Sequence, residues 1–276
     1  MNIIKNVIDI GIEKPFTFLH MTDTHITRTD ISDTKERKAF AKDRRDTYFS
    51  EADEIFEFAL GYVKKTGFQL VHTGDFIDFV TPENLRAVKR FADETDMLMV
   101  AGNHEIGNCV NNVFCEKDFT EDLKIKEETL DRVQKFFNND IRFFEKEING
   151  VTLVGIDNSD YQIRPEAFDA LKKIVSYGKP VILFMHIPLS TPHFDEKFGV
   201  DLLSMPDRIV DKLGPWKIFE TKANADTVKA HDYIVNQPLI KAVISGHWHC
   251  NYETPVESEI KQFLTDINTL REITVK

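Results

Sequence analysis

The sequence predicts an α/β protein organised around a sheet that contains parallel strands. Short apolar runs, such as residues 97–101 and 181–185, are continuous rather than alternating, as in strands that are buried on both faces. Segments with apolar residues at helical spacing lie between such runs, and this order is typical of βαβ units. Polar residues follow several runs directly, at the strand ends where α/β sheets collect their ligands.

The first hundred residues alternate between predicted strands and helices. Apolar residues at three- and four-residue spacing indicate an amphipathic helix that ends at Gly67. Pro82 suits the first turn of the next helix. The expected strands lie at residues 16–22, 68–73 and 97–101, with helices at 50–65 and 82–92.

The rest of the chain is less regular. Asn149-Gly150 between two apolar runs is a strong hairpin signal. The β-branched residues of the tail, 258–276, predict two antiparallel strands. The other expected elements are helices at 119–137 and 165–177, and strands at 141–144, 151–156, 181–185 and 241–245.

The domain organisation follows from one long irregular stretch. Residues 187–240 contain several prolines, and long connections inside compact domains tend to be lids or binding loops. No linker or change of composition marks a second domain. We therefore expect a single domain over residues 1–276, with residues 187–240 as a lid-like insertion.

Composition narrows the class of protein further. The chain has 276 residues and a net charge of −11, which argues against a broad nucleic-acid surface. No apolar run is long enough for a membrane span, and the first residues do not resemble a secretion signal. The expected location is cytoplasmic, where the three cysteines would be reduced thiols. A basic segment at 35–45 reads as a solvated helix face or as a contact for an anionic substrate.

Five predicted strand ends carry residues that bind metals. In extended chain, side chains at positions i and i+2 point to the same face, so each Asp-x-His or His-x-His pair could reach one cation. Carboxylate oxygen, amide oxygen and imidazole nitrogen suit manganese, iron or zinc, and no thiolate is needed. The residues are Asp23 and His25, Asp75, Asn103 and His104, His186, and His247 and His249.

The charge of such a site favours phosphate chemistry. Two divalent ions with two aspartates and a bound hydroxide leave a positive site that can attract a phosphate. Metal ions lower the pKa of bound water from 15.7 towards about 7, so hydroxide is present at neutral pH. A cationic His104 beside two metals is useful only if it stabilises negative charge.

These motifs resemble those of the calcineurin-like metallophosphoesterases. The family blocks stand here as DTH at 23–25, GDFID at 74–78, GNHE at 102–105, His186 after a strand, and GHWH at 246–249. They frame residues 16 to 250. The resemblance implies a four-layer αββα sandwich, in which two mixed β-sheets pack face to face with helices outside.

The resemblance also implies a role for each site residue. Asp23, His25, Asp75 and His249 would hold one divalent metal ion, and Asp75, Asn103, His186 and His247 would hold the other, with Asp75 bridging. His104 would be the general acid that protonates the leaving oxygen, and Asp78 would orient it. In protein serine/threonine phosphatases an Arg-Gly follows the second aspartate of the GDxxD block. Here Phe79 and Val80 stand instead, which disfavours that branch.

The predicted function is therefore a binuclear metal-dependent phosphoesterase. A phosphate-ester small molecule is the expected substrate, with a phosphodiester preferred because a general acid helps a poor leaving group most. The alternatives are a phosphomonoesterase, a nucleotide pyrophosphatase, a less favoured nuclease, and a non-catalytic scaffold. The sequence does not distinguish between manganese, iron and zinc, and it carries no indication of the oligomeric state.

Several other polar and aromatic residues have structural interpretations. We expect His20 and His72 to be packed core histidines, His193 and His231 to lie at the surface, and Glu105 to support its loop. Residues 157–159 could shape the pocket. The aromatic residues of the insertion, which are Phe194, Phe198, Trp216 and Phe219, could line the site but more simply pack in its own core.

Overall fold

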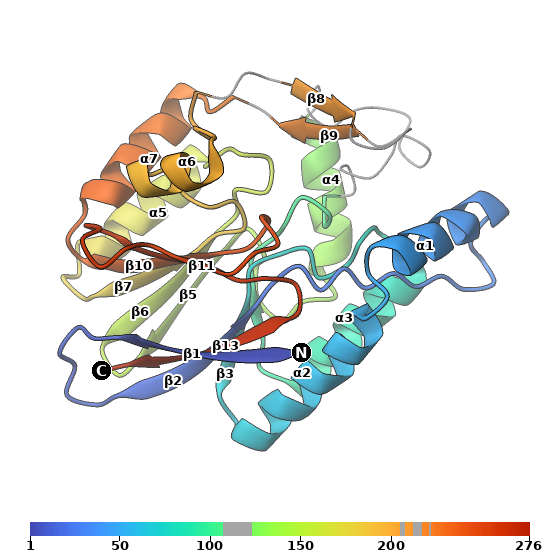
Figure 1. Ribbon diagram of the computed structural model, residues 1–276, viewed down its shortest axis with the longest axis horizontal. Coiled ribbons are helices and arrows are strands. Elements are labelled where there is room, and N and C mark those ends of the chain that lie inside the picture. Colours follow the sequence, from blue (N-terminus) through green and yellow to red (C-terminus); the bar gives the residue numbers. More distant parts are fainter. Residues whose placement is uncertain (107–122, 205–207, 212–216, 221) are drawn as a thin grey trace.

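Two mixed β-sheets packed face to face, with helices on both outer surfaces, form the architecture of this computed structural model (Figure 1). The residues described are 1–106, 123–204, 208–211, 217–220 and 222–276. The predicted four-layer αββα sandwich is confirmed. No helix in this described part is long and apolar enough to cross a lipid bilayer.

The first sheet has the strand order β1-β13-β2-β3-β4. β2, β3 and β4 run parallel to one another, whereas β13 is antiparallel to β2 and parallel to β1. Its strands are β1 (Asn2–Ile8), β2 (Phe16–Met21), β3 (Gln69–His72), β4 (Leu98–Met99) and β13 (Thr269–Val275).

The second sheet has the order β11-β12-β10-β7-β6-β5. β6, β7, β10 and β12 are parallel, and antiparallel strands close both edges. Its strands are β5 (Phe143–Ile148), β6 (Val151–Ile156), β7 (Val181–Phe184), β10 (Ile240–Ser245), β11 (Tyr252–Glu253) and β12 (Lys261–Leu264).

Apolar side chains fill each of the three spaces between the four layers. Phe18, Val71 and Ile182 belong to the core between the two sheets. The outer face of the first sheet packs against α2 (Ala52–Thr66), α3 (Pro82–Glu94) and α4 (Leu123–Gln134). The outer face of the second sheet packs against α5 (Pro165–Val175) and α7 (Ala225–Asn236). Both helical layers are visible on either side of the strands in Figure 1.

Most local predictions agree with the observed elements. Gly67 ends α2 in the left-handed conformation, and Asn149 and Gly150 both have positive φ in the β5–β6 hairpin. The tail prediction was only partly right. Its two strands do not pair with each other, because β12 joins the second sheet and β13 joins the first.

The insertion predicted at 187–240 contains several elements. They are α6 (Pro192–Phe198), β8 (Arg208–Asp211), β9 (Lys217–Glu220) and α7. Because Ala230 and Ile234 of α7 lie in the outer core of the second sheet, this helix is part of the sandwich. A lid role for the remainder stays a prediction. Phe194 and Phe198 pack with Trp248 and Tyr252, whereas Trp216, the side chain of Phe219, Cys109 and Cys115 lie outside the described residues.

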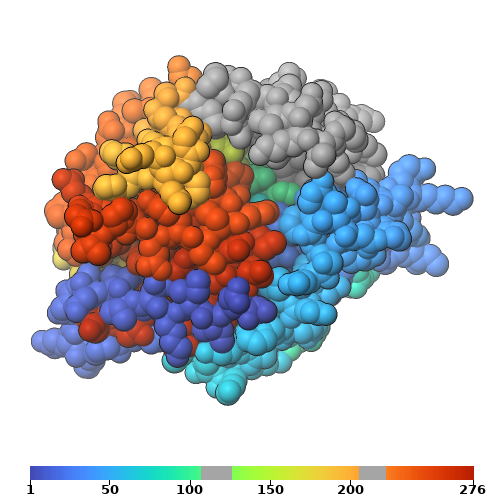
Figure 2. Space-filling model, viewed as in Figure 1, coloured from blue at the N-terminus to red at the C-terminus, as the bar shows by residue number. Residues whose placement is uncertain are grey.

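α1 (Lys35–Thr47) holds the basic segment and projects from the body of the molecule, at the right of the space-filling view in Figure 2. Most of its charged side chains are exposed, which agrees with a solvated face. Arg44 is an exception, because it reaches into the site at the strand ends.

The contact between the sheets leads to a stability prediction at Gly155 on β6. A Cβ atom there would overlap the ring of Phe144 and the side chain of Val100, which lies on the first-sheet side. We expect Gly155→Ala to destabilise the fold by about 1–3 kcal/mol through overpacking. Gly61→Ala is the matched control, because this position in α2 is open and alanine should stabilise the helix by about 0.5–1 kcal/mol. Urea unfolding would measure both, and equal effects would contradict close packing at Gly155.

Candidate metal centre

The carboxyl ends of parallel strands from both sheets meet at one edge of the sandwich. Asp23 and His25 follow β2, Asp75 follows β3, and the Asn103–His104 pair follows β4. From the second sheet, His186 follows β7 and the GHWH block follows β10. The strand-end placement predicted from the sequence is therefore observed for all of these residues.

The backbone at these ends differs from the extended form assumed in the sequence argument. Asp23, His25, Asp75, His247 and His249 all have φ between 45° and 66°, which is the left-handed region. The expectation that these pairs lie in extended chain was wrong, because their residues have left-handed backbone conformations. Such conformations cost free energy in non-glycine residues and cluster at functional sites, where the surrounding structure holds them in place.

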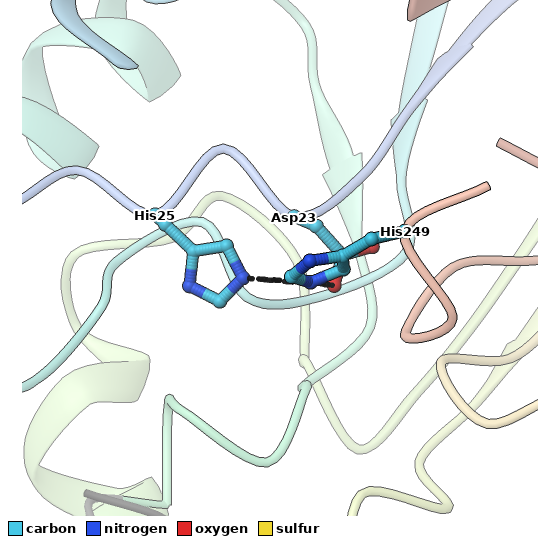
Figure 3. Close-up of side chains that lie close together, drawn as sticks. All are labelled: Asp23, His25 and His249. Carbon is cyan, nitrogen blue, oxygen red and sulfur yellow. Dashed lines mark hydrogen bonds and ion pairs between the residues drawn. The ribbon is translucent and has the colours of Figure 1, made fainter. Parts of the chain in front are cut away.

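A first cluster combines Asp23, His25 and His249. Nε2 of His249 lies 3.2 Å from Nε2 of His25 and 3.2 Å from Oδ1 of Asp23. Nε2 of His25 is 3.8 Å from the same carboxylate oxygen. Figure 3 shows the three side chains converging from the β2 and β10 loops. The side chain of His249 is 38% exposed, so the cluster is open to solvent on that side.

A second cluster lies around Nε2 of His186. This atom is 3.3 Å from Oδ2 of Asp75, 2.9 Å from Oδ1 of Asn103 and 3.1 Å from Nδ1 of His247. His247 and His249 therefore belong to different clusters, and the interpretation that this pair reaches one cation was wrong. Both residues have left-handed backbone conformations, with φ of 66° at His247 and 45° at His249, so the extended-chain rule does not apply to them.

Asp75 connects the two clusters. Its Oδ2 atom lies 3.3 Å from Nε2 of His186 in the second cluster and 3.9 Å from Nε2 of His25 in the first. The same oxygen is 3.8 Å from Nε2 of His104. One carboxylate oxygen is thus within reach of both clusters and of the histidine that was predicted to act as the acid.

The donor set fits divalent cations. Atoms that bind one cation at about 2.0–2.1 Å each lie roughly 3 Å from one another, which matches the spacings in both clusters. Two facing imidazole nitrogens without a cation must share one hydrogen. Moreover, Oδ1 of Asp23 is buried and has no hydrogen-bond partner within the residues described, which a cation would supply.

Burial and neighbouring charges shift the pKa values of these groups in opposite directions. Burial, with His104 nearby, lowers the pKa of His25 to about 4. Burial also lowers the pKa of His247 to about 3, helped by His186. Burial opposes a charge on His186 too, but Asp75 outweighs it and raises the pKa of His186 to about 9. A cation at Nε2 of His186 would replace that proton.

The ring of His104 contacts both the backbone carbonyl and the side-chain carboxylate of Asp78. Nδ1 of His104 lies 2.6 Å from the carbonyl oxygen of Asp78 and 3.2 Å from Oδ1. Because a carbonyl only accepts, Nδ1 carries a hydrogen and donates it, which leaves Nε2 directed toward Asp75. The predicted pairing of His104 with Asp78 is therefore present.

Arg44 is a partner of Asp78 that the sequence did not reveal. Its Nε and one terminal nitrogen donate to the two carboxylate oxygens at 2.7 and 2.6 Å. Burial would raise the pKa of Asp78, but Arg44 and His104 hold it well below its usual range. His25, Asp78 and His104 also lie within metal-binding distance of one another. The guanidinium on Asp78 makes this third group a poor cation site.

Glu105 holds the loops in place, as its position in the sequence suggested. Its carboxylate accepts from the backbone N–H groups of residues 75, 76, 77 and 102 at 2.7–3.2 Å. Burial and Asp75 raise its pKa to about 7. Two glycines allow the backbone to approach the site carboxylates closely. A Cβ at Gly102 would overlap Asp75, and a Cβ at Gly246 would overlap Asp23.

Other polar residues gave mixed outcomes. His20 and His72 are buried and hydrogen-bonded to threonine hydroxyls at 2.8–2.9 Å, as expected for core histidines. The surface role expected for His231 was wrong, because it is buried and its Nε2 donates to the carbonyl of Ser190. His193 is half-buried in α6.

The fold and these clusters define a class, the metal-dependent phosphoester hydrolases with a two-metal site. The family model described as calcineurin-like phosphoesterase matches residues 16–251. The chain belongs to the calcineurin-like phosphoesterase family. No curated protein sequence matches it.

Solved structures with the same fold are distant in sequence. A dimetal phosphatase from Danio rerio is 14% identical with a TM-score of 0.50, and the match covers 91% of this chain and 87% of that one. A Staphylococcus aureus protein described as a putative 5'-nucleotidase is 13% identical with a TM-score of 0.51. That match covers 95% of this chain but 51% of the other, so this chain spans about half its length.

The four N–H groups held by Glu105 lead to a second stability prediction. Glu105→Ala would leave buried donors without an acceptor, and we expect the free energy of unfolding to fall by about 3 kcal/mol or more. Glu259→Ala, at an exposed loop position, should change it by less than about 0.5 kcal/mol. Denaturant unfolding would measure both variants. A Glu105→Ala protein as stable as the wild type would show that water replaces the carboxylate without cost.

Proposed function

We propose that this protein hydrolyses a phosphodiester of a small molecule, with a pair of divalent cations and with His104 as general acid. The observation that carries the proposal is the position of Nε2 of His104, 3.8 Å from the Asp75 oxygen that joins both clusters. A substrate phosphate held over the clusters would place its leaving oxygen near this nitrogen.

The ligand assignment follows the clusters. We propose that Asp23, His25, Asp75 and His249 hold one cation. Asp75, Asn103, His186 and His247 hold the other. Manganese, iron and zinc all suit these oxygen and nitrogen donors. When bound, the cations supply positive charge for the phosphate oxygens and lower the pKa of water toward neutrality.

The chain's own groups prepare His104 for proton donation. The Asp78 carbonyl fixes the ring so that Nε2 faces the reacting group, and the Asp78 carboxylate stabilises the charged form of the ring. Arg44 keeps that carboxylate ionised and in position. A positioned acid matters most when the leaving oxygen is a poor leaving group, which favours an alkyl diester.

A protein serine/threonine phosphatase, in which an arginine clamps the phosphate, remains disfavoured. Phe79 occupies that position, where it is buried and packs edge-on against Phe40 of α1 at 5.1 Å between ring centroids. Selection among small substrates would then fall to α1 and to residues 187–204, which flank the site region in sequence. Hydrolysis of monoesters or pyrophosphates on the same clusters is the alternative.

A leaving-group series tests the role of His104. With manganese present, His104→Ala should lose about 10²–10⁴ in kcat on a diester with an alkyl leaving group. The loss should be much smaller for a p-nitrophenyl diester, whose leaving group needs no proton. Cation content should be unchanged. Tyr177→Ala is the control with wild-type rates, because this exposed residue precedes the start of β7, at the opposite end of that strand from His186.

Equal losses on both diesters would contradict the acid role. A kcat/KM for p-nitrophenyl phosphate above that for bis-p-nitrophenyl phosphate would replace the diester proposal with the monoester alternative. No hydrolysis of any ester by the manganese-loaded wild type would favour the scaffold.

Cation stoichiometry tests the sharing of Asp75. We expect two Mn²⁺ per wild-type chain by titration calorimetry and metal analysis. Asp75→Asn should weaken both sites, because an amide does not bridge as a carboxylate does. His249→Asn should weaken one, since its side chain is shorter, while asparagine tolerates the left-handed backbone at both positions. Loss of a single cation in Asp75→Asn would contradict the shared role.

A further inference from the structure

Tyr161, in the loop after β6, contacts the second cluster from outside. Its hydroxyl lies 2.8 Å from Nε2 of His247, and the two rings meet edge-on at 5.6 Å between centroids. The other ring nitrogen of His247, Nδ1, faces His186 at 3.1 Å. One ring nitrogen of His247 thus faces the cluster, and the other faces the tyrosine hydroxyl.

This arrangement decides which nitrogen of His247 is free to bind. A neutral imidazole carries its hydrogen on one nitrogen and a lone pair on the other. When Nε2–H donates to the Tyr161 oxygen, the lone pair is on Nδ1 and points into the cluster. Outer hydrogen bonds of this kind fix both the tautomer and the orientation of metal-binding histidines.

The backbone at Tyr161 is strained, which indicates that its position is enforced. Its φ is 64°, an unusual value for a bulky residue, and its side chain is buried. The backbone N–H of Tyr161 donates to the carbonyl of Asn158 at 2.8 Å and closes a tight turn. Left-handed residues of this type persist only where the surrounding structure holds them.

A buried ion pair anchors the same turn. Lys126 of α4 is fully buried, and its Nζ lies 2.8 Å from Asp157 and 2.9 Å from Asp160. This lysine is strongly held, because its removal would leave the buried Asp157 carboxylate without its counter-charge. α4 therefore fixes the residues immediately before Tyr161.

Asn158 of this turn supports the other histidine of the cluster. Its Oδ1 accepts from the backbone N–H groups of His186 and Ile187, both at 3.0 Å. Its Nδ2 donates to the carbonyl of Ile187 at 2.8 Å. The turn at 157–161 thus contacts both histidines of the cluster. Asn158 binds the backbone of His186, and Tyr161 binds the ring of His247.

We infer that Tyr161 is a positioning residue for the cation site of Asp75, Asn103, His186 and His247, acting through the Nε2 hydrogen of His247. The inference rests on the ligand assignment proposed above. The turn between β6 and α5 then holds the two histidines of one cluster, while the other cluster is built without it.

Tyr161→Phe tests this by removing only the hydroxyl. The affinity for one of the two Mn²⁺ ions should fall by about 10–100-fold, and the affinity for the other should not change. Titration calorimetry would measure both constants. Tyr252→Phe is the matched control, because that hydroxyl has no hydrogen-bond partner among the residues described, and both affinities should stay at wild-type values.

Combining Tyr161→Phe with a substitution in either cluster identifies the cation site that is affected. In His249→Asn, which keeps the second cluster, Tyr161→Phe should weaken the remaining cation by the same factor of about 10–100. In His247→Asn, Tyr161→Phe should have no further effect on cation binding. Electron paramagnetic resonance of the manganese-loaded Tyr161→Phe protein should show loss of the coupled two-ion signal at limiting metal.

Unchanged affinities in Tyr161→Phe, or equal weakening at both sites, would overturn the inference. A further effect of Tyr161→Phe in the His247→Asn background would also overturn it, since the hydroxyl would then act by another route. Absence of any Mn²⁺ binding by the wild-type chain would instead contradict the ligand assignment itself. These readouts need no turnover, so they are independent of the substrate.

Discussion

The site depends on where one buried carboxylate is held. Oδ2 of Asp75 lies between the clusters, while its Oδ1 accepts from the backbone N–H of His104 at 2.8 Å. Its own N–H donates to Glu105. Loops from three strands of the first sheet therefore meet at this residue, and His186 brings the second sheet to it. Any shift of Asp75 would alter both clusters and the distance to His104 together.

The concentration of buried acids explains why the site suits cations. Asp23, Asp75, Asp78 and Glu105 are all almost fully buried, and buried carboxylates are stable only when paired or hydrogen-bonded. The chain compensates each one differently. Arg44 forms an ion pair with Asp78, and backbone N–H groups donate hydrogen bonds to Glu105. Neighbouring imidazoles lower the pKa of Asp75 against the effect of burial. Oδ1 of Asp23 lies 3.2 Å from Nε2 of His249 but has no hydrogen-bond partner within the residues described, which suits a cation.

Local features of the sequence were sufficient to predict the strands that carry the site and the residues at their ends, whereas β1 (Asn2–Ile8) at the edge of the first sheet was not predicted. Continuous apolar runs define buried strands, and the metal-binding residue types follow them directly. The division of His247 and His249 between clusters was expected from the family resemblance but not from spacing, because the i, i+2 rule assumes extended chain and both residues have left-handed φ values. Arg44 was hidden for another reason. A basic helix looks solvated in sequence, and only tertiary packing brings one of its charges to Asp78.

The geometry of the centre is also coupled to the packing between the sheets. The first cluster takes Asp23 and His25 from the first sheet and His249 from the second, and the second cluster likewise combines Asp75 with His186 and His247. The spacing of the donors is therefore set by how closely the sheets approach. One hydrogen bond links the loops of the two sheets directly, since the backbone N–H of His247 donates to the Asp23 carboxylate at 2.9 Å. Rigid packing of the shared core is thus a condition for cation binding, since a small displacement between sheets would separate donors that a cation needs about 2 Å away.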